Sequence, residues 1–281
     1  MKKIFTLVVI INIIGIIIGS GSKAIESKME NSSINKDRFE MIKEKGLITV
    51  AAPSKETPFF FINSETNEIS GIDADIITEI TKRLGINKVE IVEETFADLL
   101  ERFNTDENID IAVGGIFITP ESEKLAAFTK PLYKESETVI VSKFSNINFM
   151  SDLKNSVVGV EKGTIFEALA KKWKENNLIK DILILESTTE LFEAISNRKI
   201  DAGLADSIII NYYLKKEENP LIRQLKDYAP ELHGVMGIAV KKDDSTLLNA
   251  LNKIIDDMKA DGTLYAILEE NGLDKNNLVS N

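Results

Sequence analysis

Short apolar runs alternate with amphipathic segments along most of this 281-residue chain. Residues 48–52 are apolar and short, as buried strands are. Residues 72–85 place isoleucines at helical spacing on one face, and residues 89–93 follow as a second strand candidate. Alternation of this kind is typical of an α/β sheet with parallel strands. We therefore expect an α/β fold that begins near Asp37.

A helix-turn-strand pattern occurs twice. Residues 94–116 and 186–208 both open with an acid and a threonine, continue through an apolar helix and a polar turn, and end in Ile-Asp and a small-residue strand. Asp110 and Asp201 hold the same place in the two copies. Two copies predict two similar lobes, because a solenoid needs at least about three short repeats. Chance similarity between two ordinary units is the alternative.

The ends of these strands are candidate binding positions. Gly115 and Asp206 each follow the repeated aspartate by five residues, and ligands of open α/β sheets bind beyond the carboxyl ends of strands. Thr164 follows another strand candidate and caps the helix after it. Thr119 has the position of a cap for a helix whose first turn is 121–124. Two helix N-termini at one cleft predict a receptor for a polar solute.

The N-terminus has the pattern of an export signal. Lys2 and Lys3 precede a mostly apolar run, residues 4–19, which is followed by small residues. We expect residues 1–24 to be a cleavable signal peptide and residues 25–36 to be a flexible tether. The alternative is an uncleaved membrane anchor.

Composition excludes several kinds of functional site. The chain has no cysteine, which excludes disulfides and thiolate metal sites, and its formal net charge of -11 repels nucleic-acid phosphates. His233 is the single histidine, and no nucleotide-binding or nucleophile motif occurs. Asp73 and Asp75 have a D-x-D spacing, for which a structural role at a helix start is favoured over a cation site. We predict no catalytic residue, no metal and no cofactor.

Motifs along the chain carry a family resemblance. In order they are GLITVAA, TPFFF, GIDADI, TFADLL, IDIAVGGIFITPES, FTKPLY, VVGVEKGT, KIDAGLADS, GIAVKKDD and MKADGTL. Together they resemble the bacterial extracellular solute-binding proteins of family 3, the polar amino acid receptors of ABC importers. The resemblance runs from about Gly46 to Leu273. It implies a two-lobed α/β fold of the type II periplasmic-binding-protein kind, in which two sheets are joined by a two-crossover hinge.

The resemblance also implies an organisation and a role. Lobe 1 is expected to comprise residues 37–133 and 237–281, and lobe 2 residues 134–236. The protein is expected to be a monomeric periplasmic or extracellular receptor and not an enzyme. It captures a small polar solute of the amino acid or amine class, closes around it, and delivers it to an ABC permease and its ATPase.

Three positions match the family's α-amino acid site. Asp206 stands where an aspartate holds the ligand's ammonium group, Thr164 where a threonine contacts its carboxylate, and Phe96 where some members have an aromatic wall. By the residues alone, Asp206 and Thr164 are also explained as helix caps. Phe96 is also explained as a core residue at helical spacing with Leu99 and Phe103.

Three other positions depart from the family pattern. Glu56 stands where an aromatic lid is usual, Phe117 where a small hydroxyl residue is usual, and Ser122 where an arginine is expected. Glu56 lies in a polar segment, where an exposed acid is the ordinary interpretation. With Gly115 at its strand end, the predicted ligand-binding set is Glu56, Phe96, Gly115, Phe117, Ser122, Thr164 and Asp206.

The absence of an arginine at Ser122 bears on the ligand. Burying a carboxylate without a partner cation costs roughly 2–5 kcal/mol of binding free energy. The pocket is therefore expected to suit a cation or a ligand whose carboxylate is masked. The alternative is that Lys162 or Lys124 replaces the arginine.

Two other functions stay open. One is a dehydratase acting on prephenate or arogenate, because related two-lobed proteins include such enzymes. The other is a sensor held at the membrane by residues 4–19.

Overall fold

The computed structural model describes residues 37–63, 65–66 and 68–279. The predicted signal peptide (1–24), the tether (25–36) and the alternative anchor (4–19) lie outside the described residues. No helix within the described ranges combines the length and the apolarity that a membrane span requires.

The first sheet is mixed. Its strand order is β5-β1-β6-β14-β7, with β1 parallel to β5 and β6, and β14 antiparallel to β6 and β7. The strands are β1 (Leu47–Ala52), β5 (Lys88–Glu93), β6 (Ile111–Ala112), β7 (Ala127–Phe128) and β14 (Ala239–Val240). The expected parallel strands are β5, β1 and β6, and the antiparallel strands β14 and β7 make the sheet mixed. The chain leaves this sheet and returns to it, and the returning strand β14 runs in the opposite direction.

Helices from both ends of the chain belong to this part of the fold. They are α1 (Arg38–Lys45), α2 (Ile72–Leu84), α3 (Leu99–Thr105), α7 (Ser245–Ala260) and α8 (Thr263–Glu270). The isoleucine stripe expected in residues 72–85 is buried in α2. Gly85 ends that helix in the left-handed conformation, with φ of 70°, which glycine adopts without steric cost. A small antiparallel sheet of β2 (Lys55–Glu56), β3 (Phe60–Ile62) and β4 (Ile69–Ser70) lies beside α2 in the chain.

The second sheet is also mixed, with the order β10-β9-β11-β8-β12. Its strands are β8 (Tyr133–Ser142), β9 (Val157–Glu161), β10 (Asp181–Leu185), β11 (Ala202–Asp206) and β12 (Ile222–Gln224). Its helices are α4 (Ile165–Glu175), α5 (Thr188–Ser196) and α6 (Ser207–Lys216). Three 3₁₀ turns complete the described elements: η1 (Ser122–Lys124), η2 (Met150–Asn155) and η3 (Lys275–Asn277).

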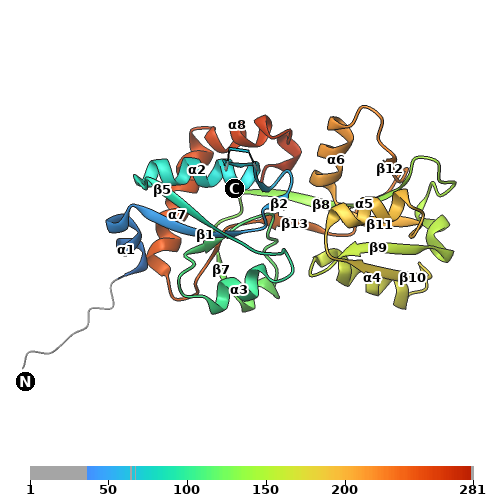
Figure 1. The fold of residues 1–281 in the computed structure, drawn as a ribbon, viewed down its shortest axis with the longest axis horizontal. Helices are drawn as coiled ribbons and strands as arrows, with labels where there is room; N and C mark the ends of the chain where they lie inside the picture. Colours follow the sequence, from blue (N-terminus) through green and yellow to red (C-terminus); the bar gives the residue numbers. More distant parts are fainter. Residues whose placement is uncertain (1–36, 64, 67, 280–281) are drawn as a thin grey trace, which may run out of the picture. The chain divides into compact units, whose positions relative to one another are not determined.

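One long strand joins the two parts. The first residues of β8 pair with β13 (His233–Met236), and its later residues pair with β11 and β12 of the second sheet. The chain therefore crosses between the sheets twice, outward along β8 and back along β13, and the two strands run side by side between the lobes (Figure 1). This is the expected two-lobed α/β arrangement with two crossovers. The residue boundaries expected for each lobe stay a prediction.

The repeated aspartates have equivalent bonds in the two lobes. Asp110 Oδ2 accepts the backbone N–H of Thr49 at 2.8 Å, and the N–H of Asp110 donates to the Thr49 carbonyl at 2.9 Å. Asp201 Oδ2 accepts the N–H of Val157 at 2.8 Å, and its own N–H donates to the Val157 carbonyl at 3.0 Å. In both lobes the aspartate thus joins the start of its own strand to the neighbouring parallel strand, at Thr49 within β1 and at Val157, the first residue of β9. The chance alternative does not explain this equivalence.

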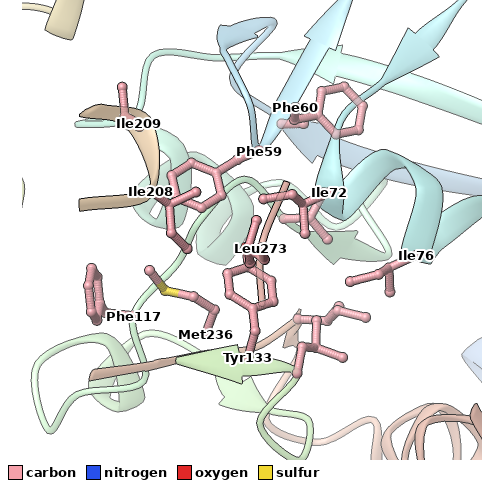
Figure 2. Packing of buried hydrophobic residues seen from close by; sticks show 14 of the residues in the cluster. Phe59, Phe60, Ile72, Ile76, Phe117, Tyr133, Ile208, Ile209, Met236 and Leu273 are labelled. Carbon is pink, nitrogen blue, oxygen red and sulfur yellow. The ribbon is translucent and has the colours of Figure 1, made fainter. Parts of the chain in front are cut away.

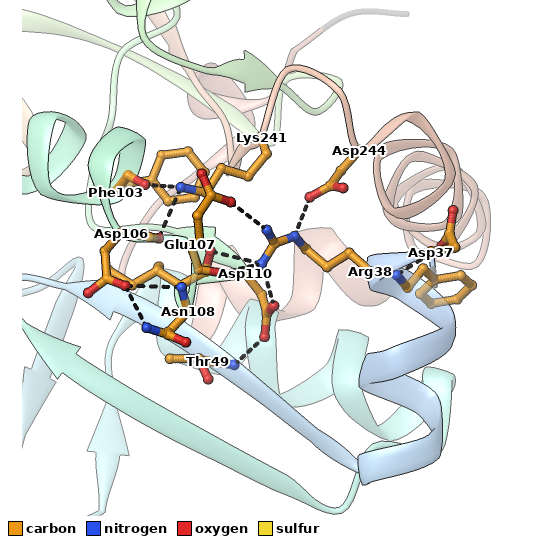
Figure 3. Close-up of polar contacts among 12 residues, drawn as sticks. Asp37, Arg38, Thr49, Phe103, Asp106, Glu107, Asn108, Asp110, Lys241 and Asp244 are labelled. Carbon is orange, nitrogen blue, oxygen red and sulfur yellow. Dashed lines mark hydrogen bonds and ion pairs between the residues drawn. The ribbon is translucent and has the colours of Figure 1, made fainter. Parts of the chain in front are cut away.

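Arg38 ties α1 to the first lobe (Figure 3). Its guanidinium lies 3.1 Å from Asp110, 3.2 Å from Glu107 and 2.5 Å from Asp244. Beside this network, the ammonium group of Lys241 donates to the carbonyls of Phe103 and Asp106. The first copy of the repeat is therefore linked both to α1 and to the returning segment of the chain.

Asp73 organises the region between the lobes. Its Oδ2 accepts the backbone N–H groups of Gly114 and Gly115, both at 2.8 Å, and its Oδ1 accepts the hydroxyl of Tyr133 at 2.8 Å. Asp75 instead accepts an amide N–H of Asn271. The D-x-D spacing thus has the structural role expected for it. Apolar side chains from both lobes, including Phe59, Tyr133, Ile208 and Met236, pack around this point (Figure 2).

The two aspartates make equivalent hydrogen bonds but should contribute unequally to the free energy of unfolding. Asp110→Ala should lower the free energy of unfolding by about 2 kcal/mol, because it leaves the Thr49 N–H without its acceptor and removes one carboxylate from Arg38. Asp201→Ala removes only the Val157 bond at a more exposed position and should lower it by less than half as much. Urea unfolding of both variants measures the difference. Equal losses contradict this reading of the Arg38 network.

Candidate functional site

A cleft of about 680 Å³ lies between the lobes. From the first lobe it is lined by the β2 and β3 region, the loop before α3 and the segment after β6. From the second lobe it is lined by the ends of β9 and β11 and the starts of α4 and α6. All seven predicted ligand-binding residues lie on its lining: Glu56, Phe96, Gly115, Phe117, Ser122, Thr164 and Asp206.

The lobes approach each other closely at the cleft. A Cβ atom on Gly163 of the second lobe would lie 2.9 Å from the Cα of Ala97 in the first. The ring of Phe117 packs edge-on against Phe166 of α4, with 5.9 Å between centroids and an interplanar angle of 88°. Gly163 therefore leaves room that a side chain would occupy, and Phe117 contributes packing between the lobes.

Two helix N-termini of the second lobe face this cleft. Asp206 caps α6, where its Oδ1 accepts the N–H groups of Ile208 at 2.8 Å and Ile209 at 3.1 Å. Thr164 caps α4, where its hydroxyl accepts the N–H of Glu167 at 3.4 Å and donates to the Glu161 carbonyl at 2.8 Å. Both residues are thus caps and cleft-lining residues at once. The cap geometry fixes their direction without occupying the cleft.

The expected helix at 121–124 is not formed. In its place η1 is a single 3₁₀ turn, Ser122–Lys124, after which the chain turns back into β7. The Ser122 hydroxyl donates to the Phe117 carbonyl at 2.8 Å and accepts the N–H of Thr119 at 2.9 Å. Ser122 is 8% exposed. Its hydroxyl therefore closes the turn, and it also engages the Thr119 amide that borders the cleft.

The structure separates Phe96 from the core residues near it in sequence. Helix α3 begins at Leu99, so Phe96 lies in the preceding loop and reaches the cleft, whereas Leu99 and Phe103 are buried in the first lobe. Glu56 belongs to the short strand β2 and is half-buried. The alternatives of a core role for Phe96 and an exposed loop position for Glu56 are therefore wrong.

Charge in the cleft is strongly one-sided. Among the described residues of its lining, six are acidic (Glu56, Glu101, Glu121, Glu161, Asp206 and Glu231) and one, Lys172, is basic. Lys172 lies 3.6 Å from Glu231. Neither Lys162 nor Lys124 reaches the lining, and Lys162 pairs with Glu186 at 3.4 Å. The hypothesis that one of these two lysines replaces the missing arginine has no support here.

Three of the acids interact across the lobes. Burial and the charges of Glu161 and Asp206 raise the pKa of Glu56 to about 8. Burial, with the charge of Asp206, raises the pKa of Glu161 to about 7, although a hydrogen bond from the Thr188 hydroxyl at 2.7 Å opposes the shift. Burial raises the pKa of Asp206 to about 6 against the hydrogen bonds it accepts. Because like charges and low dielectric disfavour ionisation, a cation among these groups would favour the charged form of all three.

Glu161 and Thr188 were missed in the sequence. Glu161 ends a strand directly before the turn that leads to α4, so its place in the motif EKGT was a usable signal. Nothing in the sequence around Thr188 marked it, because its role depends on the parallel pairing of β10 with β9.

Comparison with known proteins agrees with the fold. Residues 48–273 match the profile of bacterial extracellular solute-binding proteins, family 3. An ABC transporter arginine-binding protein of Escherichia coli (strain K12) is 29% identical over 214 residues, 76% of this chain and 85% of that protein. An ABC transporter glutamine-binding protein of Bacillus subtilis (strain 168) is 29% identical over 270 residues, 93% of this chain and 94% of that protein.

Solved structures are similar over most of the chain. An ancestral amino acid-binding protein, described as a precursor of cyclohexadienyl dehydratase, superposes with a TM-score of 0.72 at 28% identity over 83% of this chain and 98% of that one. An ancestral arginine-binding protein bound to arginine has a TM-score of 0.72 at 27% identity, with coverage of 80% and 97%. The expected type II periplasmic-binding-protein fold is confirmed.

The raised pKa of Glu56 makes ligand-free stability depend on pH. The folded pKa of about 8 exceeds the ordinary 4.5, so the stability that this group contributes is complete below pH 4.5 and is lost as pH rises through 8. Glu56→Gln keeps the side chain neutral. It should therefore match the parent at about pH 5 and exceed it in unfolding free energy at about pH 9.

Guanidinium unfolding at several pH values, without ligand, measures this effect. Glu93→Gln, at an exposed position at the end of β5, is the matched control and should show no such trend. A stability difference for Glu56→Gln that stays constant with pH would show that Glu56 keeps its charge in the cleft.

Proposed function

This chain belongs to the bacterial extracellular solute-binding proteins of family 3, and from that premise we propose that it is the receptor of an amino acid ABC importer whose ligand is a small cation of the amino acid or amine class. The solute binds in the cleft between the lobes. The observation that carries the proposal is the cleft's charge, six acids against one lysine.

A cationic ligand suits the three interacting carboxyl groups. Glu56 comes from the first lobe, and Glu161 and Asp206 from the second. A cation between them lowers the free energy of their ionised forms and draws the lobes together, because each lobe supplies charge to it. Relatives named for arginine binding are consistent with a ligand that carries a guanidinium or ammonium group.

The free carboxylate of an α-amino acid has fewer binding partners in the cleft than a cationic group has. No arginine stands at position 122, and the Ser122 hydroxyl and the Thr119 N–H are engaged with each other. A carboxylate placed beside the acids would lack a partner cation, which costs roughly 2–5 kcal/mol of binding free energy. We therefore infer that an amine, amide or ester binds more tightly than the corresponding free amino acid.

The wider role follows from family membership. Family members are extracellular or periplasmic solute-binding proteins, and we propose that this chain is exported by a cleavable signal peptide at residues 1–24. We further propose that lobe 1 comprises residues 37–133 and 237–281 and lobe 2 residues 134–236. The monomeric receptor then delivers its ligand to a permease and its ATPase.

An enzyme on the same fold is the second candidate. The structural likeness to an ancestor of a dehydratase favours it, and carboxyl groups with pKa values near 7 are suited to general acid chemistry. Prephenate and arogenate carry carboxylates, however, which the acidic cleft repels. The named relatives are binding proteins, and a binding role accounts for the cleft without a catalytic residue.

Thermal unfolding of the protein with arginine amide and with arginine tests the ligand class. A ligand at 100 times its dissociation constant stabilises a protein by about 2.7 kcal/mol, so arginine amide should raise the melting temperature more than arginine does at equal concentration. Asp206→Asn keeps an oxygen to cap α6 but removes the charge, and should weaken the response at least about tenfold in concentration.

Asp201→Asn is the matched control, since it alters the same acid type just before β11 but outside the cleft lining. It should leave the response to arginine amide unchanged. A larger response to arginine than to its amide contradicts the inferred ligand class.

Ser122→Arg tests the missing cation directly. An arginine here should increase the affinity for free arginine by about tenfold or more, because it supplies the charge and bidentate geometry that a carboxylate requires. Ser122→Ala, which loses the turn hydrogen bonds without adding charge, is the control. Calorimetric titration measures both, and no gain in Ser122→Arg shows that the cleft differs from an amino acid site by more than this position.

A further inference from the structure

Glu135 is a buried acid beside the cleft that does not belong to the proposed ligand-binding residues. It lies in the part of β8 that pairs with β13, opposite Gly234. Its side chain is 6% exposed, and no donor in the described residues hydrogen-bonds either carboxyl oxygen. A carboxylate in this position would be buried without the donors that normally stabilise its charge.

The neighbouring acid on the same strand is held quite differently. Glu137 lies two residues along β8, on the same face, and is 0% exposed. It accepts hydrogen bonds from the Tyr228 hydroxyl at 2.7 Å, the Glu231 N–H at 2.6 Å and the Leu232 N–H at 3.0 Å. The strand therefore carries one acid surrounded by donors and one acid without any.

Asp206 is the polar neighbour of Glu135. The antiparallel pairing of β8 with β11 places Asp206 opposite Glu137, so Glu135 is the next same-face position toward the hinge. The side chains of Glu135 and Asp206 are therefore neighbours, and the charge of Asp206 raises the pKa of Glu135 after burial does. Asp206 Oδ1 already accepts two backbone amides of α6. Two carboxyl groups form a hydrogen bond only when one of them carries a proton.

We propose that Glu135 is a positioning residue that remains protonated and donates its carboxyl proton to Asp206. The pair then presents one negative charge to the cleft, located on Asp206. The hydrogen bond from the hinge strand, together with the two α6 amides, sets the orientation of the carboxylate that receives the ligand's cation. The ligand part of this inference rests on the proposed function, whereas the protonation of Glu135 does not.

The surrounding groups favour the same assignment. Burial first, and then the charges of Asp206 and Glu137, raise the pKa of Glu135 well above its usual range, and the nearby N–H of Ile208 does not offset them. Tyr133 lies on the same strand, and its hydroxyl donates to Asp73.

Within the part of the chain that the structure describes, the other charged groups around this position give Glu135 no cation. Beyond Asp206 stand Glu56 and Glu161, both acids. Lys134 is exposed and alternates to the opposite face of β8, and His233 of β13 is exposed opposite Ser136. A proton is therefore the positive partner that remains.

Glu135→Gln mimics the protonated acid, because its amide is neutral and can donate to Asp206. Without ligand, the parent should lose stability relative to this variant as pH rises, since the folded parent must retain a proton that the unfolded chain releases above about pH 4.5. Unfolding free energies at about pH 5, 7 and 9 should show a gap that widens with pH. A gap that is absent or reversed overturns the protonation.

Glu137→Gln is the matched control on the same strand. Its amide nitrogen cannot accept the hydrogen bonds that the lost oxygen received, so this variant should be less stable than the parent at every pH. Carbon-13 spectra of the ligand-free protein give an independent readout: the Glu135 carboxyl signal, assigned by its loss in Glu135→Gln, should have the chemical shift of a protonated carboxyl group at about pH 7. The chemical shift of an ionised carboxylate at that pH overturns the proposal.

Binding of arginine amide tests the positioning role. Glu135→Leu removes the donor and should weaken binding at least about tenfold, and Glu135→Gln should restore affinity to within about threefold of the parent. If Gln loses as much affinity as Leu, Glu135 acts as a second negative charge and the proposal is wrong. If the parent binds no arginine amide, the proposed ligand class fails, while the stability and carbon-13 measurements still decide the protonation of Glu135.

Discussion

Hydrogen bonds from backbone amides to carboxylates hold distant segments of this chain together. Asp73 joins the start of α2 to the segment after β6, and Asp110 and Asp201 each join two neighbouring parallel strands. Glu137 joins the hinge strand to the segment before β13. At Asp73 and Glu137, which are buried, a charge-assisted bond of this kind satisfies an amide and a buried charge at once. The positions of the lobes and their strands depend on these bonds.

The cleft is the region where such donors run short. Glu56 is half-buried and Glu161 is buried, both with few donors, and Glu135 has none among the described residues. A carboxyl group without donors keeps its proton or requires a cation. The same physical rule that makes Asp73 a structural centre therefore makes the cleft acids receptive to a positively charged solute. The acids with a structural role and the acids of the cleft are the same types of side chain. They differ in how many hydrogen-bond donors surround them.

Membership of the family and the ligand class rest on different features. The fold is shared with solved structures at 27–28% identity, because it depends on strand order and buried apolar residues that many sequences satisfy. The ligand depends on a few cleft positions. Ser122 shows how small the difference is: one hydroxyl both replaces an expected cation and engages the Thr119 amide within a tight turn.

Local pattern in the sequence determined much of this protein. The alternation of apolar segments predicted the α/β class, and the Ile-Asp repeat identified Asp110 and Asp201, whose bonds are equivalent in the structure. Motif resemblance predicted six residues and strand-end position a seventh, Gly115, and all seven lie on the cleft lining. These features are readable because strand burial, caps and turns depend on residues close together in the chain.

The tertiary structure decided what depends on distant partners. The first sheet is mixed because β14 returns to it in the opposite direction, and the second is mixed because β8 runs antiparallel to β11. The turn at Ser122 forms where a helix was expected. Glu135 and Glu137 are the same residue type on one face of one strand, yet only Glu137 meets amides, from a segment more than 90 residues away. The sequence specifies which groups can ionise, and the fold decides which of them find a donor, a proton or a ligand.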